Sequence, residues 1–265
     1  MENNIHQRKK EEREFHNFLI STELAKDKDK EKYDYYHSNR KFYSIAGKGY
    51  RFQENWLKER CQGKKVLVLG CGEGAESFFL AKNGAEVIGI DISERSISNA
   101  EQNAIREGVA DKTTFLVMDA ESLKLKDNTF DIITASGMIH HIDFSKVLPE
   151  MLRVIKPNGE IICIEPLKYN PIFQLYRKLT PHLRTKWEAG HILGRKEIFM
   201  PKKYFDKVEL HFFHLAVFLA VPFRNTPVFN RLLSFLEAID LVILKFPLIE
   251  WLAWQVVFIL SDPKK

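Results

Sequence analysis

Cysteine is scarce in this chain of 265 residues, and its spacing excludes two kinds of structural support. The three cysteines, Cys61, Cys71 and Cys163, form no Cys-x-x-Cys pair. An odd number of widely spaced cysteines provides neither an even disulfide framework nor the paired ligands of a structural zinc site. We therefore expect a protein of the reducing cytoplasm that holds no metal.

Long apolar runs are also missing. In the apolar last third of the chain, the longest stretches without Lys, Arg, Asp or Glu are residues 210–223 and 251–261. Both are shorter than the ~18–20 apolar residues that a membrane-spanning helix requires. The first residues, MENNIHQRKKEEREFHN, are charged and contain no apolar core, so we expect no signal peptide.

Charge is only slightly unbalanced over the whole chain, since 40 basic residues face 35 acidic ones and give a net charge of +5. The excess is concentrated in residues 168–207, which contain ten Lys or Arg and only three acidic residues. Ten of the 20 phenylalanines then lie between Phe199 and Phe258. A basic segment beside an apolar one favours a partner that is both anionic and hydrophobic, and the alternative is a basic face that meets only water.

The composition predicts two domains, an arm at residues 1–60 and a main domain at residues 61–265. The arm begins with mixed charges, which indicate a solvated helix or a loosely held segment. It continues with many aromatic residues, which either pack on the main domain or cover a ligand. Within the main domain, residues 167–206 interrupt the regular pattern and are expected to form an inserted lid.

Strand and helix patterns alternate in the main domain up to Pro166, as is typical of a parallel α/β sheet with helices on both faces. Short apolar runs predict the strands, and stretches of helical periodicity predict the helices. The expected strands are 65–70, 86–92, 113–119, 129–136, 160–165, 207–213 and 254–260. The expected helices are 75–83, 93–108, 144–155 and 227–244.

The clearest sign of a binding site is Gly70-Cys71-Gly72-Glu73-Gly74, directly after the first expected strand. Glycine permits positive φ and lets a ligand approach the backbone closely. Ligands of open α/β sheets bind beyond the carboxyl ends of the strands, where this loop lies. Asp91 ends the second expected strand and is suited to accept hydrogen bonds from a ribose diol. The alternative is a tight turn and a helix-capping aspartate without a ligand.

Two cofactors fit this loop. Gly70, Gly72 and Ala75 also satisfy the fingerprint of dinucleotide binding, so an NAD(P)-dependent oxidoreductase has to be weighed. A dinucleotide pyrophosphate, however, would lie beside the acidic Glu73, whereas S-adenosylmethionine carries no phosphate and tolerates an acidic neighbour.

Five segments together resemble the class I S-adenosylmethionine-dependent methyltransferases, especially the small-molecule group similar to the ubiquinone and menaquinone C-methyltransferases (the methyltransferase type 11 domain). They are VLVLGCGEG (66–74), VIGIDIS (87–93), MDAESL (118–123), FDIITASGMIHHI (130–142) and LRVIKPNGEIICIEP (152–166). The resemblance is good over residues 64–166, weaker in the later strands and nearly absent before residue 60. It implies a Rossmann-like, seven-stranded, mostly parallel sheet whose last strand, Trp254–Leu260, is antiparallel.

The resemblance also implies S-adenosylmethionine as the cofactor and S-adenosylhomocysteine as its product. The implied cofactor-binding residues lie on the glycine loop and at the strand ends: Gly70, Cys71, Gly72, Gly74, Asp91, Ile92, Asp119, Ala120 and Ser136. The glycines line the methionine part, and Asp91 holds the ribose. Asp119 meets the adenine amino group, and Ser136 lies near the sulfonium.

Two other functions receive less support. Base methyltransferases of this fold carry Asn/Asp-Pro-Pro-aromatic or a Pro-Cys nucleophile after the fourth strand, whereas residues 135–141 here read Ala-Ser-Gly-Met-Ile-His-His. A nucleic-acid methyltransferase that uses the basic lid is therefore an alternative, and we expect no nucleic-acid partner. A regulatory protein that binds the cofactor without catalysis is the second alternative.

Histidines are the candidates for a catalytic base, because imidazole transfers protons near neutral pH. His140 and His141 follow the fourth strand, and His191 lies in the lid. The alternative is that these histidines only pack or cap the next helix. Glu188 and His191 have the spacing Glu-x-x-His, but no third ligand is evident, so we expect no metal site there.

The lid residues favour an amphiphilic acceptor. Arg177, Arg184 and Arg195 are suited to bind a carboxylate or phosphate. Aromatic residues are expected to form apolar walls: Tyr36, Tyr43, Phe173, Tyr176, Trp187, Phe199 and Phe205. The sequence therefore predicts a methyltransferase for a small, partly hydrophobic or amphiphilic metabolite with an anionic, lipid-like character. Contact with a membrane surface, without a transmembrane helix, is a further hypothesis.

Overall fold

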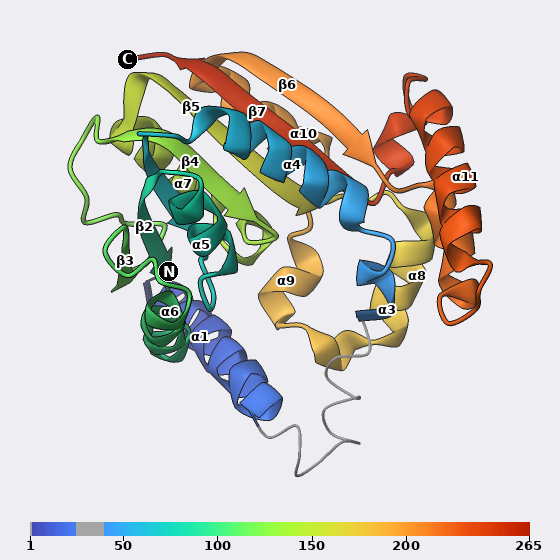
Figure 1. The fold of residues 1–265 in the computed structure, drawn as a ribbon, viewed down its shortest axis with the longest axis horizontal. Coiled ribbons are helices and arrows are strands. Elements are labelled where there is room, and N and C mark those ends of the chain that lie inside the picture. The colour runs from blue at the N-terminus through green and yellow to red at the C-terminus, as the bar shows by residue number, and fades with distance from the viewer. Residues whose placement is uncertain (1, 25–39) are drawn as a thin grey trace.

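The computed structural model describes residues 2–24 and 40–265, and its centre is a seven-stranded sheet (Figure 1). The strand order is β3-β2-β1-β4-β5-β7-β6. The strands are β1 (Lys65–Leu69), β2 (Glu86–Asp91), β3 (Thr113–Val117), β4 (Phe130–Ser136), β5 (Ile155–Pro166), β6 (Phe205–Phe213) and β7 (Gln255–Pro263). β1 pairs in parallel with β2 and β4, while β7 is antiparallel to both β5 and β6. This arrangement confirms the predicted fold class, including the reversed last strand.

Helices cover both faces of the sheet. Alternate strand residues point to opposite sides, so Val66 and Val68 belong to one core cluster while Leu67 and Leu69 belong to the other. The first face is covered by α4 (Gly47–Arg60), α5 (Ala75–Lys82) and α6 (Glu94–Arg106). The second is covered by α7 (Phe144–Val154) and α10 (Arg195–Phe199). Burial on both faces explains why the strands read as continuous apolar runs.

Local sequence signals account for several element boundaries. The hydroxyl oxygen of Ser93 accepts a hydrogen bond from the Ser96 amide at 3.0 Å and caps α6. β5 is longer than expected because it begins before the Pro157–Gly159 segment. Phe130 of β4 pairs with Ile155, and Ile132 pairs with Glu160, so that segment bulges out of the β4–β5 ladder.

Residues 167–206, the predicted lid, form several short helices. They are α8 (Pro171–Leu179), η2 (Pro181–Leu183), α9 (Lys186–Gly190), α10 and η3 (Met200–Lys203). In Figure 1 α8 and α9 lie beyond one edge of the sheet, as does α1 (Glu2–Leu24), which packs beside α6. That edge carries the carboxyl ends of the parallel strands, so the lid and the first helix lie where a ligand is expected.

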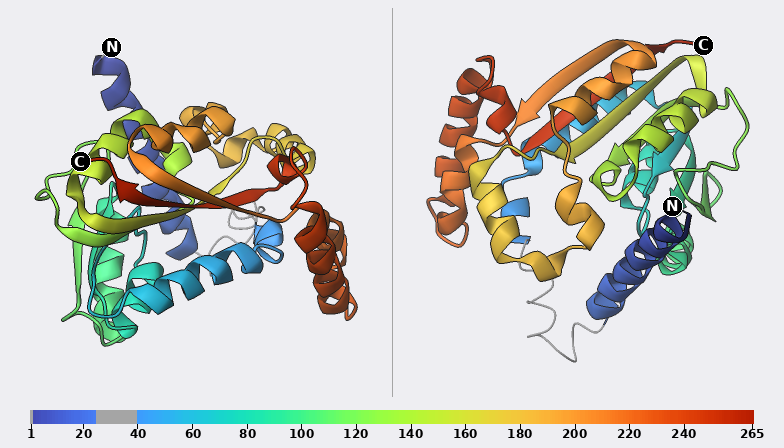
Figure 2. Two further views of the ribbon diagram at one scale, coloured as in Figure 1. Left: turned by 90° about the horizontal axis from the view of Figure 1, so that it is seen from above. Right: turned by 180° about the vertical axis from the view of Figure 1, so that it is seen from behind.

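A third core cluster stands outside the sheet. It joins α3 (Arg40–Tyr43), α8, η4 (Ala216–Phe223) and α11 (Phe229–Ile243), with Phe42, Phe218 and Trp254 among its buried members. Figure 2 shows α11 beyond the end of the sheet in both views. Within residues 2–24 and 40–265, no helix is long and apolar enough to cross a bilayer.

Candidate functional site

The glycine loop is held against the end of β2 by Asp91. Its Oδ2 accepts a hydrogen bond from the Gly72 amide at 3.0 Å, and its Oδ1 accepts one from the Ser93 amide at 2.9 Å. Gly70 has a φ of +65°, and a Cβ there would lie 2.4 Å from Cγ of Met138. Glycine is therefore required at position 70 by both backbone conformation and space.

A cavity of about 310 Å³, the first cavity, opens beyond the ends of β1, β2 and β4. It brings together eight of the predicted site residues, which come from four separate segments of the chain. They are Gly70, Gly72, Asp91, Ile92, Asp119, Ala120, Ser136 and His141. The loop, the β2 carboxylate and the residues after β3 and β4 thus share one space, as the resemblance implied.

Cys71 and Gly74 do not line this cavity. The Cys71 side chain is buried in the core cluster on the opposite side of the loop, where burial and the charge of Asp91 raise the pKa of its thiol. Gly74, at a φ of +98°, precedes the first residue of α5. Both residues shape the loop through the backbone, so their predicted direct contact with a cofactor is not supported by the geometry.

Helix α1 contributes four residues to the first cavity: Arg8, Lys9, Glu12 and His16. Lys9 forms ion pairs with Asp119 and, at 3.1 Å, with Glu121. Burial alone would lower the pKa of Lys9, but the hydrogen bonds to both carboxylates outweigh it and raise the pKa. The residue pattern predicted a solvated or loosely held segment and missed these contacts, because the partners are more than 100 positions away (110 for Lys9 and Asp119).

A second cavity of about 300 Å³ lies next to the first and shares His16, Gly137 and His141 with it. Six of its lining residues are Phe, Tyr or Trp: Phe15, Phe42, Tyr43, Tyr50, Phe173 and Trp254. Its charged members, Arg177, Arg184 and Glu188, all come from the lid. Two adjoining spaces with a common wall are suited to hold two ligands in contact.

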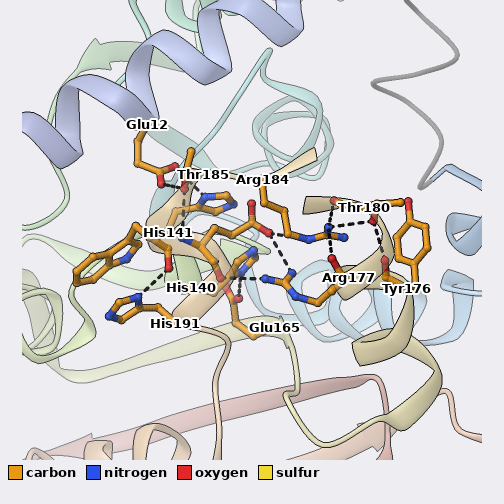
Figure 3. A network of polar contacts seen from close by, with 12 residues as sticks. Glu12, His140, His141, Glu165, Tyr176, Arg177, Thr180, Arg184, Thr185 and His191 are labelled. Carbon is orange, nitrogen blue, oxygen red and sulfur yellow. Dashed lines mark hydrogen bonds and ion pairs between the residues drawn. The ribbon is translucent and has the colours of Figure 1, made fainter. Parts of the chain in front are cut away.

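His141 lies in that common wall (Figure 3). Its Nδ1 is 3.0 Å from Oε2 of Glu12, and Oε1 of Glu12 accepts a hydrogen bond from the Thr185 hydroxyl. Burial alone would lower the pKa of His141, but the hydrogen bond to Glu12 and the charges of Glu188, Glu12 and Glu165 outweigh it and raise the pKa. A carboxylate that fixes one imidazole nitrogen leaves the other available for proton transfer.

His140 has a different environment from its neighbour. Its Nδ1 lies 2.6 Å from Oε2 of Glu165, whose other oxygen accepts the amides of Met138 and Ile139 at 2.8 and 2.7 Å. The residue lines only the second cavity. Glu165 therefore fixes the turn after β4 and the orientation of His140 together.

His191 lies outside both cavities, which argues against its predicted catalytic role. Its exposed ring stacks on Trp187 with a centroid separation of 3.5 Å, and its Nδ1 lies 2.7 Å from the Trp187 carbonyl oxygen. The geometry turns the ring toward α9 rather than toward the shared wall (Figure 3).

Two of the three predicted anion-binding arginines point inward. Arg177 donates to the side chain of Glu188 at 3.0 Å and to its carbonyl at 2.9 Å, and Nε of Arg184 lies 3.6 Å from the same carboxylate. Arg195 is exposed and lies 4.8 Å above the ring of Trp251, away from the cavities. The lid thus presents two guanidinium groups and one carboxylate to the second cavity.

The predicted aromatic walls are partly correct. Tyr43 and Phe173 line the second cavity, whereas Tyr36 lies outside the described residues. Phe205 is fully buried in the main core instead. The others contact different partners: Tyr176 lies beneath Arg184, Trp187 beneath Arg8 of α1 and Phe199 beside Trp251.

Glu12, His16 and His141 also place potential ligand atoms within 4.8 Å of one another, close enough for one metal ion. Both carboxylate oxygens of Glu12 already have partners, in Thr185 and His141. Hydrogen bonds thus occupy the Glu12 carboxylate, and Nε2 of His16 lies 3.8 Å from its Oε2.

Comparison with known proteins identifies the region around the first cavity. Residues 67–163 match a family model described as a methyltransferase domain. This segment is a class I, S-adenosylmethionine-dependent methyltransferase domain. The matched residues contain the glycine loop, Asp91, Asp119 and both histidines after β4.

Relatives of the methyltransferase domain differ in what their names say they methylate. A ubiquinone biosynthesis O-methyltransferase of Pseudomonas fluorescens is 33% identical over 125 residues, which are 46% of this chain and 53% of that protein. Phosphoethanolamine N-methyltransferase 3 of Arabidopsis thaliana is 36% identical over 122 residues, which are 44% of this chain and 24% of that protein. The chain thus spans about half the length of the first relative and about a quarter of the second.

Solved structures confirm the fold of the methyltransferase domain. A phosphoethanolamine N-methyltransferase 2 of Haemonchus contortus, in complex with phosphomonomethylethanolamine and S-adenosylhomocysteine, superposes with a TM-score of 0.55. The match is 19% identical and covers 80% of this chain and 52% of that one. At this identity the likeness concerns the fold alone.

Proposed function

We propose that this protein transfers the methyl group of S-adenosylmethionine to a small, partly hydrophobic or amphiphilic acceptor with an anionic end. The cofactor would occupy the first cavity and the acceptor the second. The observation that carries this proposal is the common wall at His16, Gly137 and His141.

Methyl transfer from a sulfonium is an in-line displacement, so its rate depends on holding donor and nucleophile on opposite sides of the methyl group. Two separate but adjoining cavities supply this arrangement, because each ligand is confined to its own side. With an acceptor bound, the aromatic side chains of the second cavity would also shield the nucleophile from water.

The contacts of the first cavity suit S-adenosylmethionine. Asp91 would accept the ribose hydroxyls, and Asp119 would accept the adenine amino group in place of Lys9. Glu73 lines the same cavity, where its carboxylate accepts a hydrogen bond from Asn99 at 2.6 Å. Such a carboxylate is compatible with a cationic sulfonium and unfavourable for a pyrophosphate.

His141 is the proposed proton acceptor for a nucleophile that must lose a proton. Glu12 would stabilise the imidazolium that forms, because its carboxylate lies 3.0 Å from Nδ1. Glu165 holds His140 beside His141, and the two imidazole rings have a centroid separation of 4.3 Å. His140 is proposed to position the acceptor.

The second cavity supports an amphiphilic acceptor. Arg177 and Arg184 together exceed the single negative charge of Glu188, so an anionic group would restore the balance. The aromatic side chains would bury the rest of the acceptor. Because these two arginines point inward, they are not available to a nucleic-acid backbone.

Calorimetry with S-adenosylhomocysteine and with NADH tests the cofactor, and binding of S-adenosylhomocysteine alone is expected. Methyl transfer from labelled S-adenosylmethionine should then favour hydrophobic hydroxy acids over their esters. Exclusive binding of NADH would refute the proposal, and equal rates with acids and esters would refute its anionic acceptor.

A further inference from the structure

Exposed apolar side chains are concentrated at one end of the molecule. Helix α8 carries Ile172, Leu175 and Leu179 on its outer face, and Leu179 is 71% exposed. Their spacing places them on one side of the helix. The opposite side of α8 contributes Phe173 and Arg177 to the second cavity. One helix therefore separates the proposed acceptor site from an apolar surface.

Helix α11 continues this pattern. Its inner side is anchored by Leu236, which is buried, and by Asp240, which accepts the amides of Leu215 and Ala216 at 3.0 and 2.6 Å. With that side fixed, Phe235 and Leu241 face outward and are 64% and 56% exposed. The apolar surface does not arise from a loosely placed helix.

Exposed apolar side chains also follow the end of α11. Phe246, Leu248 and Ile249 are all exposed before η5 (Glu250–Leu252) begins. Soluble monomers rarely expose so many large apolar residues in one region, and such surfaces usually mark an interaction site.

The exposed charges of this region have one sign. Between residues 219 and 252 the exposed charged side chains are Arg224, Arg231 and Lys245. The acidic residues of the same range, Glu237, Asp240 and Glu250, are buried or half-buried. Lys178 adds a further exposed positive charge on α8. Apolar residues combined with basic ones, without exposed acids, match the chemistry of an anionic membrane surface.

We infer that the outer faces of α8, η4 and α11, with the segment to Leu252, dock on an anionic lipid bilayer. The apolar side chains enter the headgroup boundary, and the basic residues lie against lipid phosphates. Docking itself does not depend on the proposed methyl transfer. A corollary that does rest on it is that α8 brings the second cavity next to the bilayer, so an amphiphilic acceptor is supplied from the membrane.

Co-sedimentation with vesicles tests the docking. The full chain is expected to sediment with phosphatidylcholine vesicles that contain about one third phosphatidylglycerol, and less with phosphatidylcholine alone. Added salt should weaken the binding. No sedimentation with the anionic vesicles at low salt would overturn the inference.

A double substitution, Leu241→Glu with Val242→Glu, tests the surface itself. Both side chains are more than half exposed, at 56% and 59%, so the fold should tolerate the change. Vesicle binding is expected to fall by at least about tenfold, since apolar burial is lost and two negative charges face the lipid. Ile105→Glu on α6 is the matched control, because Ile105 is 72% exposed outside this surface, and it should bind like the parent.

Two results separate the possible explanations. Equal vesicle binding by the double variant and the Ile105 control would overturn the docking surface. Concentration-dependent dimers that the double variant abolishes, without vesicle binding by the parent, would assign the surface to a second copy and also overturn the inference. Binding of S-adenosylhomocysteine by the double variant checks its fold. Absence of that binding in the parent, the double variant and the Ile105→Glu control alike would instead contradict the proposed function.

Discussion

Replacing Asp91 with alanine tests the proposed ribose contact most directly. The carboxylate lines the first cavity and simultaneously accepts the amides of Gly72 and Ser93. The substitution therefore has two separable consequences, one for cofactor affinity and one for the stability of the loop.

The expected magnitudes differ enough to be told apart. Hydrogen bonds to a charged group contribute ~1.5–3 kcal/mol each, so the loss of both ribose contacts corresponds to ~3–6 kcal/mol, or about 10²–10⁴-fold weaker binding. The amides of Gly72, which is half-buried, and of Ser93, which is buried, lose an acceptor. We expect ~1–3 kcal/mol of lost stability and a melting temperature that is lower by several degrees.

Calorimetry with S-adenosylhomocysteine and thermal unfolding measure these two quantities. Ser93→Ala is the matched control, because it removes the cap that Ser93 gives to Ser96 and the 2.6 Å hydrogen bond from its hydroxyl to Asn17 of α1, at a cost of ~1–2 kcal/mol, but leaves the carboxylate in place. It should lose stability and keep its affinity. An Asp91→Ala protein that is folded and binds S-adenosylhomocysteine as well as the parent would refute the ribose assignment.

Three further predictions concern the second cavity and its wall. Because Glu12 helps to raise the pKa of His141 above 6.5, the rate should rise with pH only above that value, and Glu12→Gln should lower the maximal rate and move the rise to lower pH; an unchanged pH–rate profile would contradict the role of the pair. Arg184→Gln should raise KM for an anionic acceptor about tenfold with little change in kcat, and an equal effect on a neutral analogue would remove the charge argument. His191→Ala should retain parental activity, since the ring lies outside both cavities, and a large loss of kcat would restore it as a candidate base.

The positions of the glycine loop and of Asp91 follow from local sequence. The glycine loop needs only one strand end and residues with positive φ, and Asp91 needs only the end of the next strand. Both features are encoded within a few consecutive residues. The reversed last strand came instead from resemblance, since the apolar pattern of Gln255–Pro263 contains no information about its direction.

Contacts between distant segments were not predictable. Glu12 and His141 are 129 positions apart, and the mixed charges around Glu12 are typical of a solvated helix. The side-chain contacts of the lid were equally unpredictable from the sequence. The net charge of the lid is evident from composition, but whether Arg177 turns toward Glu188 or toward solvent depends on tertiary packing, in which its guanidinium lies over the ring of Phe173.

The bonds of Glu12 connect the two ligand spaces mechanically. One carboxylate joins α1 to the turn after β4 through His141 and to the lid through Thr185. A displacement of α1 large enough to free one cavity therefore removes a wall from the other in the same movement. Exchange of either proposed ligand by movement of α1 would therefore open the cavity of the other as well.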